Sequence, residues 1–99
     1  MKINVLIADD FPLIRSAIEA AISRDPDITV VGAAGTGSEV VELADQLQPD
    51  VILLDVHMPD MSGLVALERI MTKSAQPRVL MLTASEKADV FLEAIASGA

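Results

Sequence analysis

Three aspartates and a threonine are the side chains whose positions in this sequence suggest chemistry. Asp9 and Asp10 follow a short apolar segment, Asp55 ends a second apolar run, and Thr83 follows a third. Each of these segments has the composition of a buried β-strand. The carboxyl ends of parallel strands meet at one edge of a sheet, where open α/β proteins bind their ligands. The sequence therefore predicts a group of carboxylates with a hydroxyl beside it.

Such a group of carboxylates is suited to binding a hard cation. Like charges held close together repel one another, and a divalent cation relieves that repulsion. Oxygen ligands favour Mg²⁺ over softer metals. A carboxylate beside a magnesium-bound phosphoryl group can attack it and form an aspartyl phosphate. Asp55 stands alone at its strand end and is the predicted nucleophile, while Thr83 is placed to hydrogen-bond a phosphoryl oxygen.

The segments that must position these residues alternate between strand and helix patterns. We expect strands over residues 3–8, 28–34, 51–54 and 78–82, where apolar and β-branched residues dominate. Between and after them, apolar residues at helical spacing predict four helices, the first starting at Pro12 and the fourth running to about Ser97. This alternation implies an α/β fold with a doubly wound parallel sheet and helices on both faces.

The first three predicted helices each have one apolar face and a recognisable start or end. Ser38 is the expected N-cap of the second helix. The expected buried faces, in chain order, are Ile14, Ala17, Ile18, Ala21 and Ile22, then Val40, Val41, Ala44 and Leu47, then Leu64, Leu67, Ile70 and Met71.

Composition limits the classes of function that this chain can have. Its 99 residues suffice for one domain, and its net charge of −8 disfavours nucleic-acid binding by this segment and binding to an anionic membrane. The sequence has no cysteine, no signal peptide and no apolar run long enough to span a bilayer. We therefore expect a cytoplasmic domain that does not bind a membrane.

Several motifs, in order and at compatible spacing, resemble the receiver domain of bacterial two-component response regulators. They are Asp9-Asp10, the apolar run into Asp55, Met58-Pro59-Asp60-Met61-Ser62-Gly63, and Leu82-Thr83-Ala84. The segments 9–15 and 30–32 look most like the subgroup with a LuxR-type helix-turn-helix output domain. The resemblance covers the whole chain, residues 1–99, and implies a flavodoxin-like fold.

The resemblance implies a role for each matching residue. Asp55 accepts a phosphoryl group from a sensor histidine kinase or a small phosphodonor, and the domain controls a transcriptional output domain that this chain does not contain. Asp10 and Asp55 ligate Mg²⁺ together with the backbone carbonyl of His57, and Asp9 assists through water. Thr83 turns toward the phosphoryl group after transfer, and Ala84 leaves room for it.

The chain departs from the family pattern at its C-terminal side. Relatives have five strand–helix units, whereas four are predicted here, so the chain is expected to be a receiver domain truncated before the fifth unit. The lysine that ends the fifth strand and pairs with the phosphoryl group is therefore not among its residues. We expect such a chain to be destabilised or to self-associate as a homodimer, by pairing sheet edges or swapping elements.

Other interpretations compete with these assignments. Asp9 and Asp10 alone would suit the N-terminus of a helix. The side chain of His57 is interpreted as incidental, and the glycines of residues 32–37 do not have the spacing of a dinucleotide-binding loop. At the level of function, the alternatives are a magnesium-dependent aspartyl-phosphate phosphotransferase or phosphatase, and a receiver remnant that cannot be phosphorylated. The receiver interpretation itself is that of a signalling switch and not of an enzyme.

Overall fold

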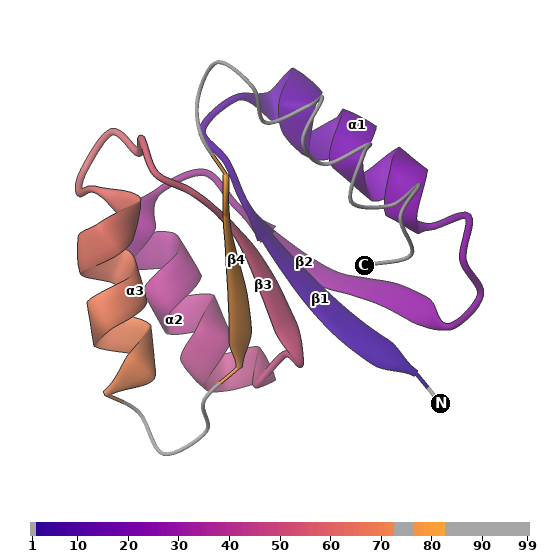
Figure 1. Ribbon diagram of the computed structural model, residues 1–99. Coiled ribbons are helices and arrows are strands. Elements are labelled where there is room, and N and C mark those ends of the chain that lie inside the picture. Colours follow the sequence, from indigo (N-terminus) through magenta and orange to yellow (C-terminus); the bar gives the residue numbers. More distant parts are fainter. Residues whose placement is uncertain (1, 73–76, 83–99) are drawn as a thin grey trace.

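The computed structural model describes residues 2–72 and 77–82. Strand and helix alternate in chain order: β1 (Ile3–Ala8), α1 (Pro12–Ile22), β2 (Ile28–Ala34), α2 (Gly37–Leu47), β3 (Val51–Asp55), α3 (Gly63–Met71) and β4 (Arg78–Leu82). The four strands form one parallel sheet in the order β2-β1-β3-β4. Helix α1 covers one face, and α2 and α3 lie side by side on the other (Figure 1). The predicted doubly wound α/β fold is confirmed.

The core forms two layers because successive strand residues point to opposite faces of the sheet. Val5 and Ile7 of β1 pack with Ile18 and Ile22 of α1 on one side. Leu6 and Ala8, which alternate with them, pack on the other side against residues of α2 and α3, which include Val40, Ala44, Ala66 and Ile70. Strands buried on both faces therefore read as continuous apolar runs in the sequence.

The helix starts follow general capping rules, with one correction. Pro12 occupies the first turn of α1, where its missing N–H has no partner to lose. The N-cap of α2 is Thr36, whose hydroxyl accepts a hydrogen bond from the Glu39 N–H at 3.1 Å. The prediction of Ser38 for this position was wrong, because the helix begins at Gly37, two residues earlier than a cap at Ser38 would place its start.

The buried face of α3 also differs from the prediction. Leu64 and Met71, which were expected to be buried, are exposed to 60% and 36%. The buried residues of α3 are Gly63, Ala66 and Ile70, of which only Ile70 was predicted. These residues share one side of the helix at the i, i+3, i+7 spacing. Gly63 and Ala66 are small and contribute little to an apolar pattern. The prediction therefore placed the larger Leu64, on the neighbouring side of the helix, in the core.

Two smaller differences concern α1 and α2. Ala17 and Leu47 are exposed, although both were expected to face the core. Apart from Gly37, the buried residues of these helices are among the predicted ones: Ile18 and Ile22 in α1, and Val40 and Ala44 in α2.

Within the described residues, β2 and β4 form the two edges of the sheet. No helix within it is long and apolar enough to cross a membrane. The predicted fourth helix, together with Thr83 and Ala84, lies outside the described residues.

Candidate functional site

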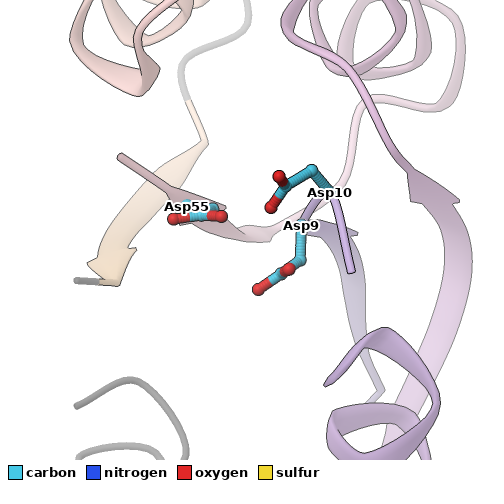
Figure 2. A group of neighbouring side chains, drawn as sticks. All are labelled: Asp9, Asp10 and Asp55. Atoms are coloured by element: carbon cyan, nitrogen blue, oxygen red, sulfur yellow. The ribbon is translucent and has the colours of Figure 1, made fainter. Parts of the chain in front are cut away.

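The three predicted aspartates meet at the carboxyl end of the two central strands. In the parallel register of β1 and β3, Ala8 pairs with Leu54, so the residues that follow them, Asp9 and Asp55, emerge side by side. Figure 2 shows Asp9 and Asp10 at the end of β1 and Asp55 at the end of β3, with their carboxylates gathered together. Asp9 and Asp55 are fully buried, whereas Asp10 is accessible to solvent.

The separation of these carboxylates fits a metal site. One ligand oxygen from each aspartate lies within 4.8 Å of the others. At an effective dielectric constant of about 20, two unit charges at such a distance repel by roughly 3 kcal/mol. A divalent cation removes this cost, and a set of oxygen ligands held by aspartates suits Mg²⁺, which keeps some water in its shell. The donor set therefore fits the predicted magnesium ion.

Asp55 is held by the loop that follows it, residues 56–62, here called the acceptor loop. The His57 N–H donates a hydrogen bond to Oδ1 of Asp55 at 3.1 Å, which orients the carboxylate. Gly63, the first residue of α3, donates through its N–H to the Val56 carbonyl at 2.7 Å. A Cβ atom on Gly63 would collide with the backbone carbonyl oxygen of Asp55 and the Cα of Val56. The loop can close this tightly only because residue 63 is glycine.

Asp9 is held both by its side chain and by its backbone. Its Oδ1 accepts a hydrogen bond from the Phe11 N–H at 2.9 Å. The Arg15 guanidinium, on the first turns of α1, donates to the Asp9 carbonyl at 2.6 Å. Phe11 is the N-cap residue of α1, so neither aspartate is itself the cap of this helix, although both precede its N-terminus. One oxygen of each aspartate lies within 4.8 Å of an Asp55 oxygen.

A fourth aspartate joins the acceptor loop to α2. Oδ1 of Asp60 accepts from the Gly37 N–H at 2.7 Å, and its Oδ2 accepts from the Ser38 N–H at 2.9 Å and the Ser38 hydroxyl at 2.6 Å. The Ser38 hydroxyl above all, followed by the two N–H groups, lowers the pKa of Asp60 from 3.8 to about 2. Asp60 therefore remains ionised throughout the physiological pH range.

The structure brings together most of what the sequence predicted for this edge of the sheet. Asp9, Asp10 and Asp55 converge, and the side chain of His57 is exposed. Strand β4 lies beside β3, with Leu82 opposite Asp55, as the expected placement of Thr83 requires. Thr83 and Ala84 themselves lie outside the described residues.

Sequence reasoning missed the structural contacts of Arg15, Asp60 and Gly63. The sequence indicated no contact for Arg15. The glycine that opens α3 gave a usable signal, since it follows a capping serine and a proline-containing loop. No local pattern indicated Asp60, because its partners lie 22 and 23 residues away in the chain.

Comparison with known proteins identifies the family. The chain matches the response regulator receiver domain family over residues 5–99. It therefore belongs to the receiver domains, the phospho-accepting switches of two-component systems.

Its relatives combine this domain with different outputs. The chain is 41% identical to the nitrate/nitrite response regulator protein NarL of Escherichia coli K12 over 96 residues, which are 97% of this chain and 44% of NarL. It is 44% identical to protein-glutamate methylesterase/protein-glutamine glutaminase 1 of Caulobacter vibrioides over 99 residues, 99% of this chain and 29% of that protein. The chain thus spans less than half the length of either relative.

Solved structures agree with the sequence comparison. A two-component response regulator of the LuxR family from Aurantimonas sp. SI85-9A1 superposes with a TM-score of 0.80 at 26% identity. The match covers all of this chain and 71% of the regulator's. The predicted flavodoxin-like receiver fold and the resemblance to LuxR-type regulators are both confirmed.

Proposed function

We propose that Asp55 is the phosphoacceptor and that Asp9, Asp10 and Asp55, with the backbone carbonyl of His57, hold a magnesium ion. The observation that carries this proposal is the convergence of three carboxylates within 4.8 Å around a buried strand end. Burial of Asp9 and Asp55 supports it further, because a site shielded from bulk water strengthens electrostatic interactions and protects an acyl phosphate from hydrolysis.

Different residues of the chain have different roles in phosphoryl transfer. An oxygen of the Asp55 carboxylate attacks phosphorus, the bond from phosphorus to the donor breaks, and the leaving group departs with its electron pair. The His57 N–H holds Oδ1 of Asp55 and so limits rotation of the nucleophile. Arg15 and the Phe11 N–H hold Asp9 in place. When bound, Mg²⁺ neutralises charge on the carboxylates and on the phosphoryl oxygens.

The resemblance to the family extends the proposal to residues outside the described part. Thr83 hydrogen-bonds the phosphoryl group after transfer, and Ala84 leaves space for this movement. The position of β4 beside β3 supports this assignment, because the backbone of Leu82 accepts a hydrogen bond from the Val56 N–H at 3.0 Å. A change at this end of β4 then alters the surface presented to a partner.

A sensor histidine kinase is the proposed phosphodonor, and transcription is the proposed output. Similarity to NarL and to a LuxR-family regulator supports an output domain that binds DNA. The methylesterase relative supports a second candidate, in which the same kind of switch controls an enzyme domain. The site described here serves either output, and residues 1–99 would be the switch. We propose the cytoplasm as its location, where such kinases present their phosphohistidine.

Phosphorylation with a small donor tests the proposed function. The protein is incubated with acetyl phosphate with and without Mg²⁺, and intact mass spectrometry counts phosphoryl groups. We expect one group per chain, only with Mg²⁺, and none in Asp55→Asn. Labelling that survives in Asp55→Asn would contradict the assignment of the phosphoacceptor. No labelling in the wild-type protein would support a remnant, and multiple turnover of a phosphate ester would support an enzyme.

A further inference from the structure

The acceptor loop is joined to a part of the fold that takes no part in the proposed chemistry. Asp60, near the tip of the loop, receives three hydrogen bonds from the first two residues of α2, all between 2.6 and 2.9 Å. Both carboxylate oxygens are used, and the positive end of the helix dipole favours the negative charge. The contact is therefore charge-assisted and directional.

Packing around this contact leaves the loop little freedom to shift. Gly37 is buried, and a Cβ atom on it would collide with the side chain of Met61 and approach Oδ1 of Asp60 to 3.2 Å. Met61 in turn packs against the core between the sheet and α2. The tip of the loop thus rests directly on the backbone at the start of α2.

The base of the loop is closed by a second set of contacts that reaches the acceptor aspartate. His57 and Ser62 form an antiparallel bridge across the base. The same His57 donates its N–H to Asp55. With its tip held by Asp60 and its base held by this bridge, the loop has one defined path, and the backbone of His57 is part of that path.

From this arrangement, we infer that Asp60 is a positioning residue for the phosphoacceptor site: it fixes the acceptor loop so that the backbone of His57 stays aligned with Asp55 and the bound cation. This inference rests on the proposed magnesium site. Asp60 itself contacts neither the carboxylate cluster nor a phosphoryl group in the role we assign to it. It acts through the acceptor loop, because its hydrogen bonds to α2 hold the tip of the loop in place.

A purely structural role for Asp60, as a cap of α2, makes a different prediction. Helix α2 already has a cap of its own in Thr36, which binds the Glu39 N–H and belongs to the segment before the helix. Thr36→Ala therefore weakens the same helix end without touching the Asp60 contacts. It is the matched control for Asp60→Ala, because both variants remove a hydrogen-bond acceptor from the N-terminus of α2.

Two measurements separate positioning from capping. Magnesium affinity is measured by isothermal titration calorimetry of the protein with MgCl₂, and exchange of the His57 amide is followed by NMR in the absence of metal. We expect Asp60→Ala to weaken magnesium binding roughly tenfold, at the low end of the range seen for residues that support metal ligands. We also expect the His57 amide to exchange faster, with Asp60→Asn between Asp60→Ala and wild type.

Thr36→Ala is expected to leave both the magnesium affinity and the His57 exchange rate at wild-type values, even where it lowers stability. Equal effects of Asp60→Ala and Thr36→Ala would overturn the inference and leave Asp60 a cap. Unchanged magnesium affinity and unchanged His57 exchange in Asp60→Ala would overturn it as well. A wild-type protein that does not bind Mg²⁺ would instead show that the proposed magnesium site is wrong, so the two failures are distinguishable.

Discussion

Gly63 lies directly against the backbone of the acceptor aspartate. There is no room for a side chain at this position, so the residue must be glycine. We expect Gly63→Ala to destabilise the protein by about 2–3 kcal/mol, because the added methyl group meets backbone atoms that cannot move aside. Urea denaturation measures the change. Gly35→Ala is the control: its Cβ would approach no backbone atom but only the Arg15 guanidinium, at 3.1 Å, which also donates to the Asp9 carbonyl, and it should cost less than half as much. Equal losses would contradict this reading.

The charge of Asp60 makes the stability of the folded protein depend on pH in the acid range. Its pKa is lowered to about 2 in the folded protein from 3.8, chiefly by the Ser38 hydroxyl. Because the folded pKa is the lower one, the stabilisation is present above pH 3.8 and is lost as the pH falls toward 2. The stability difference between wild type and Asp60→Asn should therefore shrink across this window. Denaturation at several pH values measures it, and the pH dependence should be weaker in a Ser38→Ala background.

At the scale of elements, the end of α2 holds one residue in an unfavourable conformation. Gln48 caps the helix in the left-handed region, with φ of 46°, and is the one residue other than glycine with positive φ in the described part. Glycine adopts this conformation without steric cost, and so Gln48→Gly should stabilise the protein by about 1 kcal/mol. Thermal denaturation checks the change. Gln46→Gly, two residues earlier within the helix, should destabilise by a similar amount.

Apolar patterns in the sequence predicted the strands better than the buried faces of the helices. Strands β1 and β3 were predictable because burial on both faces requires a continuous apolar run. The buried face of α3 was not, because its contact residues Gly63 and Ala66 are small and their burial depends on close approach to the sheet. The cap of α2 was predicted at Ser38 but is Thr36. Both side chains can cap, and the position of the first helical residue decides between them.

At the scale of the whole molecule, the carboxylate cluster links folding to metal binding. Three acids within 4.8 Å destabilise the folded state without a cation, and Mg²⁺ that binds only the folded state stabilises it. At a Mg²⁺ concentration of ten times Kd, we expect the free energy of unfolding to rise by about 1.4 kcal/mol. This corresponds to an increase in Tm of several degrees, measured by circular dichroism.

Asp55→Asn is the matched variant for this experiment. It removes one charge from the cluster and one metal ligand while keeping the size of the side chain. We expect it to be more stable than wild type without Mg²⁺ and to gain much less from its addition. A wild-type Tm that does not respond to Mg²⁺, or an equal gain in Asp55→Asn, would argue against the cluster as the magnesium site.

The fold class and the members of the acidic cluster follow from the order and spacing of residues along the chain. Alternating strands and helices force parallel strands, and parallel strands bring residues that follow their carboxyl ends, such as Asp9 and Asp55, to one edge. The contacts that hold these residues in place, in contrast, depend on tertiary packing. Arg15 on the Asp9 carbonyl, Gly63 against Asp55, and Asp60 on the start of α2 are contacts between separate segments. Their geometry depends on how helices and loops pack on the sheet, which no local pattern of residues records.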